Sequence, residues 1–184
     1  GCTLKLLDYS GVNDGEIFDI SKGRFTVDLN KNDGTTTFAF DVKGGDITFT
    51  ASQAASGLFT GVTVSGENAN VLIDSKATLN SLVVNSGKVT VDGANIGTIT
   101  INGGDTVIKN VHAGSLSVEG NGSGNISIVS GEFGSTTFER DSGYTLGMAI
   151  ASGSIVCINS FTIYTYDAIQ TMTKTDRIFV EKCD

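Results

Sequence analysis

Short alternations of apolar and polar residues recur along most of the chain, and each has the form apolar–polar–apolar. Alternation with a period of two over a few residues is typical of half-buried β-strands. A first series of these triplets recurs every 17–24 residues and consists of Phe18/Ile20, Phe38/Phe40, Val62/Val64, Leu82/Val84, Ile99/Ile101, Leu116/Val118 and Thr136/Phe138. A second series lies between them and consists of Phe25/Val27, Ile47/Phe49, Val71/Ile73, Val89/Val91, Thr106/Ile108 and Ile126/Ile128. The pattern therefore predicts many short strands at a regular spacing.

A third, shorter element precedes the first-series triplets from the middle of the chain onward, at residues 79–81, 96–98, 113–115 and 133–135. Turns rich in glycine and asparagine separate the elements, for example at residues 43–46 and 102–104. Glycine and asparagine tolerate the positive φ angles that tight corners require. We therefore expect each repeat to carry three short elements joined by tight turns.

Two architectures accommodate this repeat: an antiparallel sandwich or barrel, and a parallel β-solenoid in which each repeat is one coil. Sandwich strands usually run about 5–6 residues and need not repeat in register. Here the triplets and the corner elements keep their order, as expected when copies stack and each buries its apolar side on the next. We predict an all-β protein, a single-stranded parallel β-solenoid (β-helix) of about seven short coils.

The polar residues at the centres of the triplets are expected to form outward-facing rows. The first row is predicted to contain Asp19, Ala39, Thr63, Val83, Thr100, Ser117 and Thr137. The second row is predicted to contain Thr26, Thr48, Leu72, Thr90, Val107 and Ser127. Stacked threonine and serine suit an exposed parallel surface, because β-branched side chains fit the pleat and the hydroxyl stays in water.

The composition of the chain changes at about Tyr144. Both methionines and three of the four tyrosines, Tyr144 included, lie from this residue onward. A solenoid exposes unpaired backbone at its ends and needs caps. We therefore predict a solenoid repeat domain over residues 1–143 and a C-terminal cap over residues 144–184, packed on the same domain. A short helix is expected at residues 145–151. The alternative for the C-terminal segment is a binding appendage.

The three cysteines are expected to lie at two ends of the rod. Cys157 and Cys183 belong to the same predicted cap and are able to pair, whereas Cys2 lies at the opposite end. Seven coils at roughly 4.8 Å each would separate the ends by about 30 Å, far beyond the span of a disulfide. Cys2 is therefore predicted to pair with neither. A lipid anchor and an ordinary cysteine both remain open for Cys2.

Charge excludes some classes of partner. The chain has 12 Lys and Arg against 20 Asp and Glu, which gives a net charge of −8. An acidic chain repels phosphate, so we expect no nucleic-acid partner. The sequence also holds no apolar run of the length that a membrane span requires.

Candidate catalytic chemistry is sparse. The single histidine, His112, lies at a predicted corner with no orienting partner evident in the sequence. Asp74 and Asp92 each follow a second-series strand, so they are candidates for a stacked pair of ligand-binding carboxylates. Proteins bind calcium with six to eight oxygen ligands, and the sequence contains no calcium-binding loop motif. We predict no metal site and no cofactor, and solvated turn acids are the alternative reading of both aspartates.

Two tyrosines are candidates for sugar binding. Tyr164 and Tyr166 lie on one face if residues 161–166 are extended. Exposed aromatic rings stack on sugars and polar groups bond to sugar hydroxyls. The alternative is that both rings pack within the cap.

The repeat texture resembles a known family. Residues 97–104 (GTITINGG) and 130–135 (SGEFGS), with the tail at 143–147 (GYTLG) and 178–183, are similar to pectate-lyase-like β-helix repeat segments of large bacterial cell-surface, adhesin-like proteins, especially of gut Gram-positive bacteria. The likeness runs from about Gly61 to the end of the chain. It implies an exported module at the bacterial cell surface, and no site residue is carried across.

These expectations converge on a non-catalytic extracellular module, adhesin-like or carbohydrate-binding, or on a structural spacer of a larger exported protein. Its partner would be a glycan or a host surface protein. The alternative is a polysaccharide lyase or hydrolase, which is disfavoured because the three arginines are far apart along the predicted rod. An ice- or mineral-binding surface is a further alternative, and Val83, Leu72 and Val107 interrupt the rows that it would need.

Overall fold

The computed structural model describes residues 2–5, 13–29, 37–52, 60–118, 124–140, 144–147, 156–158 and 161–165. Within these residues it contains strands and no helix. Every pairing between strands is parallel, so the predicted all-β parallel β-solenoid is confirmed.

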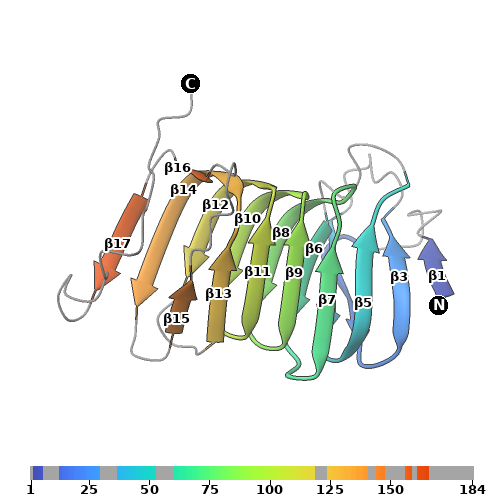
Figure 1. Ribbon diagram of the computed structural model, residues 1–184. Helices are drawn as coiled ribbons and strands as arrows, with labels where there is room; N and C mark the ends of the chain where they lie inside the picture. The colour runs from blue at the N-terminus through green and yellow to red at the C-terminus, as the bar shows by residue number, and fades with distance from the viewer. Residues whose placement is uncertain are drawn as a thin grey trace.

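The strands form two sheets that face each other along a rod (Figure 1). The odd-numbered sheet contains, in spatial order, β1 (Cys2–Lys5), β3 (Arg24–Asp28), β5 (Gly45–Thr50), β7 (Ala69–Ile73), β9 (Lys88–Asp92), β11 (Asp105–Lys109), β13 (Gly124–Ile128) and β15 (Tyr144–Gly147). The even-numbered sheet contains β2 (Glu16–Ile20), β4 (Phe38–Val42), β6 (Thr60–Val64), β8 (Thr78–Val84), β10 (Asn95–Ile101), β12 (Val111–Val118), β14 (Gly131–Arg140) and β16 (Val156–Ile158). β17 (Phe161–Thr165) also pairs with β14.

The chain alternates between the two sheets, so each coil contributes one strand to each. The pairs from β4/β5 to β12/β13 make about five turns of the rod. Most of residues 144–184 lie outside the described residues, and the predicted cap lies there. The expected helix at 145–151 is wrong at its beginning, because Tyr144–Gly147 forms β15 parallel to β13.

The core fills the space between the sheets with the inward residues of the two apolar series. The second-series register is confirmed, for example where Ile47 pairs with Val71 and Val71 with Val89. Near the N-terminal end the core is aromatic: the Phe40 ring centroid lies 5.7 Å from that of Phe18 and 5.4 Å from that of Phe49. Burial of these series is the main stabilising contribution expected for the rod.

The first series stacks differently from the prediction at its N-terminal end. Phe40 pairs with Val62, so the residue that lies outward between Asp19 and Thr63 is Asp41 rather than Ala39. β4 carries three buried apolar residues at alternate positions, and a slip of two residues keeps every side chain on its own face. Alternation alone therefore did not determine this register.

The predicted third element is not a separate strand, because it merges with the following triplet. β8 and β10 have 7 residues each, β12 has 8 and β14 has 10. Glycines stack where the two parts join: a Cβ on Gly114 would lie 2.6 Å from the Gly97 carbonyl oxygen, and one on Gly134 would lie 2.5 Å from that of Gly114. The close approach lets one long strand replace two short elements and a corner.

Thr60, Thr106 and Thr136 bring a hydroxyl into the buried interior. Thr106 is 1% exposed, in an inward row between Val89 and Ile126, and its Oγ1 has no hydrogen-bond partner among the described residues. A buried hydroxyl without a partner loses its hydration free energy and gains no bond in return. We expect Thr106→Val to raise the free energy of unfolding by about 1 kcal/mol, measured by urea denaturation.

The matched control is Thr90→Val, on the outward face of the adjacent strand. Thr90 is half-buried and faces outward, so we expect a change within about 0.5 kcal/mol. A lower denaturation midpoint for Thr106→Val would show that the buried hydroxyl does make a stabilising bond.

Candidate functional site

A shallow groove of about 560 Å³ crosses the outer face of β3, β5, β7 and β9. We call it the β3–β9 groove. Because successive coils stack, it runs along the rod axis, perpendicular to the strands. Its outward-facing lining residues are Arg24, Thr26, Asp46, Thr48, Asn70, Leu72 and Thr90.

Two rows of side chains make up this lining, because alternate residues of a strand point to the same face. The polar row takes one residue from the start of each of β3, β5 and β7, with Arg24 paired to Asp46 and Asp46 to Asn70. The exposed Lys88 of β9 is in register with Asn70 and continues this row beyond the groove lining. The threonine row is the predicted second outward row, confirmed here for Thr26, Thr48, Leu72 and Thr90. The groove therefore repeats hydrogen-bonding groups at the strand spacing, about 4.8 Å.

The polar row is held by its own hydrogen bonds. Arg24 donates to Asp46 Oδ2 from Nε at 3.2 Å and from Nη2 at 3.0 Å, and Asn70 Nδ2 donates to Asp46 Oδ1 at 3.1 Å. The hydrogen bond from Asn70, and next that from Arg24, hold the pKa of Asp46 below its ordinary value. The carboxylate stays ionised at neutral pH, and its charge is balanced by the guanidinium. The Arg24 and Asp46 side chains are 79% and 46% exposed, so this pair orders the groove more than it stabilises the fold.

We expect Asn70→Ala to raise the pKa of Asp46 toward its ordinary value, because the amide of Asn70 is the largest cause of the shift. The folded-state pKa lies below that of the unfolded chain. The carboxylate therefore contributes stability above the unfolded-state pKa, and this contribution is lost as the pH falls through the folded-state pKa. An NMR titration of the Asp46 carboxyl carbon measures the shift.

Asn85→Ala is the control for this titration. Asn85 accepts a hydrogen bond from Asn102 Nδ2 at 2.8 Å in another part of the surface. An unchanged Asp46 pKa in Asn70→Ala would mean that the amide does not determine the ionisation of the groove.

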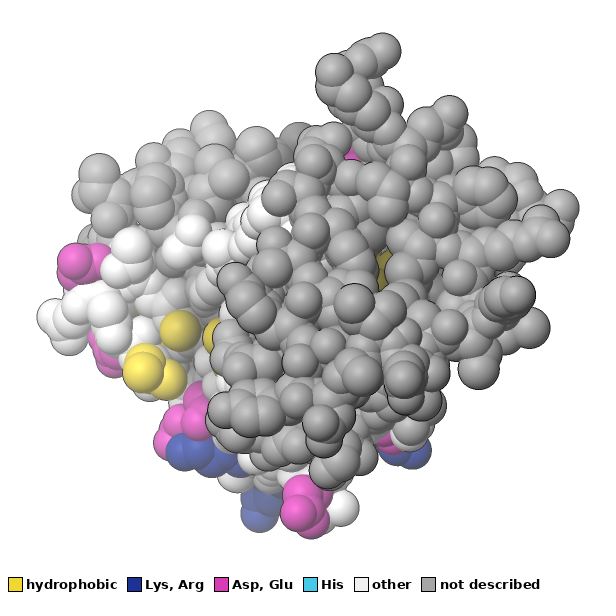
Figure 2. Space-filling model, turned by 90° about the vertical axis from the view of Figure 1, so that its left-hand side faces the viewer, with side chains coloured by type: hydrophobic (Ala, Val, Ile, Leu, Met, Phe, Trp, Pro, Cys, Tyr) yellow, Lys and Arg dark blue, Asp and Glu magenta, His cyan; other side chains and the backbone are white. Residues whose placement is uncertain are grey.

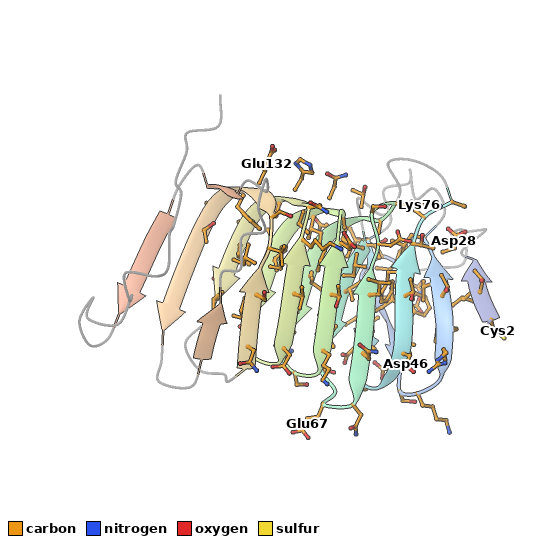
Figure 3. All side chains as sticks on the ribbon, viewed as in Figure 1. Cys2, Asp28, Asp46, Glu67, Lys76 and Glu132 are labelled. Atoms are coloured by element: carbon orange, nitrogen blue, oxygen red, sulfur yellow. The ribbon has the colours of Figure 1, made fainter. Side chains whose placement is uncertain are left out.

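Asp74 and Asp92 occupy successive coils, as predicted, but each has a partner of its own. Asp74 Oδ1 accepts a hydrogen bond from the backbone N–H of Lys76 at 2.9 Å, and Asp92 Oδ2 accepts one from Lys109 Nζ at 2.8 Å. Both lie at the ends of their strands, away from the polar row. Figure 3 shows Asp46 at the lower edge of the rod and Lys76, in the turn after Asp74, at the upper edge. A ligand-binding role for the two aspartates stays a prediction.

The two tyrosines stay predictions as well. Tyr164 lies in β17, in register with Glu139 of β14. Tyr166 lies outside the described residues, as does Cys183. Cys2 is an exposed free cysteine.

The structure gives His112 a partner that was not evident in the sequence. His112 Nδ1 lies 3.0 Å from Glu132 Oε2, because β12 and β14 pair these residues. The repeat in the sequence indicates this pair. Residues 113–115 and 133–135 are equivalent elements of successive repeats, and His112 and Glu132 directly precede them. The two side chains are 59% and 63% exposed, so the pair interacts weakly.

No metal-binding group of three or more His, Cys, Asp or Glu occurs in the part of the chain that the structure describes. Among the same residues, no helix is long and apolar enough to cross a membrane.

Figure 2 views the rod from its β17 end and shows basic and acidic side chains next to one another along the lower edge.

No family model, curated protein or solved structure matches this chain. Sequence reasoning missed the polar row of the β3–β9 groove, although the signal was present: Arg24, Asp46 and Asn70 each directly precede a second-series triplet. Stacking of that series places all three on one line.

Proposed function

We propose that this protein is a non-catalytic module of the bacterial cell surface that binds carbohydrate in the β3–β9 groove. The observation that carries the proposal is the groove itself, which extends along the rod and repeats hydroxyl, amide and charged groups from strand to strand. A polysaccharide presents hydroxyls at a similar repeat along its own length. Polar groups at fixed positions beside a small apolar surface are the features of a site that orients such a ligand.

The chemistry of the groove favours binding over the alternative of a polysaccharide lyase or hydrolase. A glycosidase needs two carboxyl groups, one of them protonated to act as an acid. The groove lining contains one carboxylate, Asp46, and its hydrogen bonds to Asn70 and Arg24 keep it ionised. Turnover of polygalacturonate, with and without calcium, would favour the enzyme instead.

The finer features of the architecture belong to the same proposal. We propose a rod of about seven coils over residues 1–143, closed by a cap over residues 144–184. A cap covers the apolar core and the unpaired strand edges at the end of a solenoid. An extracellular location and an adhesin-like role toward a host glycan or surface protein follow from the family resemblance alone. A spacer role is the outcome if no ligand is found.

A change in the floor of the groove tests the proposal. Thr48 is half-buried at the centre of β5, and Thr48→Met removes its hydroxyl and fills space without altering charge. We expect binding on a glycan array to weaken about tenfold, a loss of about 1.4 kcal/mol in binding free energy. Solution titration of the best array hit gives the Kd.

Thr100→Met is the matched control, because Thr100 is an equally half-buried outward threonine in β10 of the other sheet. It should bind as the wild type does. Equal binding by both variants would place the ligand outside the groove, and a Tyr164→Ala variant would then test the C-terminal segment. A wild-type protein that binds no glycan would contradict the proposal.

A further inference from the structure

The charged groups of the β3–β9 groove cancel each other. Its lining holds one cation, Arg24, and one anion, Asp46, joined at 3.0 Å, and its remaining residues are uncharged. The whole chain carries a net charge of −8. The groove lining is therefore electrically neutral, on an acidic protein. The nearest cation in the same row is the exposed Lys88 of β9, which is in register with Asn70 and lies beyond the lining.

This balance discriminates among polymers by charge. An anionic polymer would approach an acidic protein and find no cation in the groove lining that is free of an anionic partner. A cationic polymer would have to compete with Arg24 for the Asp46 carboxylate. Within the groove lining, each charged ligand would thus break an existing ion pair or leave one of its own charges without a partner.

A neutral polymer can use the groove as it stands. Arg24 donates two N–H groups to Asp46 and has others to give, and the amide oxygen of Asn70 accepts hydrogen bonds. The hydroxyls of Thr26, Thr48 and Thr90 both donate and accept. Leu72, which is 38% exposed, offers an apolar contact to the C–H face of a sugar ring. Such groups suit a ligand whose own polar groups are hydroxyls.

We infer that the β3–β9 groove selects an uncharged linear polysaccharide lying along the rod axis, and that the Arg24–Asp46 ion pair sets this selectivity. The inference rests on the proposed function and adds the ligand class and the residues that choose it. Asp46 and Arg24 are specificity-determining residues, since removal of either leaves the other charge exposed in the groove.

The test compares three soluble polymers at moderate salt by isothermal titration: hydroxyethylcellulose as the neutral probe, polygalacturonate as the anion and glycol chitosan as the cation. We expect the wild type to bind the neutral polymer at least about tenfold more tightly than polygalacturonate. Asp46→Asn leaves Arg24 without its anion, and its affinity for polygalacturonate should rise at least about fivefold. The double variant Arg24→Gln/Asp46→Asn restores neutrality and should lose that gain.

Asp19→Asn is the control for overall charge. Asp19 also forms an exposed ion pair, to Lys43 Nζ at 2.7 Å, but on the other sheet. Asp19→Asn changes the net charge by the same amount as Asp46→Asn and should not alter the affinity for polygalacturonate. An equal gain in Asp19→Asn and Asp46→Asn would overturn the role of the Arg24–Asp46 pair.

The binding measurements distinguish a failure of the inference from a failure of the proposed function. If the wild type prefers polygalacturonate and Arg24→Gln abolishes that binding, the inference is overturned while the groove remains a carbohydrate site. The inference is likewise overturned if glycol chitosan is preferred and Asp46→Asn abolishes its binding. If the wild type binds none of the three polymers and no glycan on the array, the proposed function fails and the inference with it.

Discussion

Gly66→Ala is expected to lower the free energy of unfolding by about 3 kcal/mol or more. Gly66 lies in the turn between β6 and β7, directly against the preceding coil. A Cβ at this position would overlap the carbonyl oxygen and the carbonyl carbon of Lys43. The obstacle is backbone, so a side-chain rotation does not relieve it, and the two coils must separate. Equilibrium denaturation in urea measures the loss.

Gly61→Ala is the control, because Gly61 lies in β6, the strand that precedes the same turn. Its added Cβ would meet the Ser81 hydroxyl at 2.9 Å, which can rotate away, and Ala39 Cβ at 3.5 Å. We expect a change within about 1 kcal/mol, since alanine also reduces the entropy of the unfolded chain. Similar losses in the two variants would show that the coils are not stacked as closely at Gly66 as the structure has them.

Phe40→Ala is expected to cost about 3–5 kcal/mol, the range for an aromatic residue removed from a packed core. Phe40 is 2% exposed, and its ring contacts those of Phe18, Phe38 and Phe49. Its removal leaves a cavity where the two sheets face each other near the N-terminal end. The denaturation midpoint should fall, and near-ultraviolet circular dichroism should lose part of the aromatic signal.

Ile17→Ala is the control for Phe40→Ala. Ile17 lies on the outer face of the neighbouring strand β2, next to the partly buried Phe18, and is 64% exposed, so Ile17→Ala should change stability by at most about 0.5 kcal/mol. A small effect of Phe40→Ala would indicate that Phe40 does not fill the core between the sheets. Only a register shifted by an odd number of residues would turn Phe40 to the outer face and give such a result.

The sequence predicted the candidate site only in part. It placed Thr26, Thr48, Leu72 and Thr90 in one outward row, which the structure confirms. It did not predict the polar row beside them, because apolar–polar–apolar alternation marks the centre of each triplet and not the residue before it. It directed attention to Asp74 and Asp92 instead, and each of these has a local partner. The groove is formed by the polar row and the threonine row together, so neither row alone predicts it.

By itself, the sequence determined the class of fold and the side on which most residues lie. A period of two assigns each residue to the core or the surface, and a repeat of 17–24 residues predicts stacked coils; both are local properties of the chain. Only the tertiary structure decided three further points: the two-residue shift at Phe40, the merging of the short elements at Gly97 and Gly114, and the pairing of Arg24 with Asp46. These depend on how residues about one coil apart meet across a sheet. Alternation is unchanged by a slip of two residues, so the choice between such registers is made by contacts between neighbouring coils.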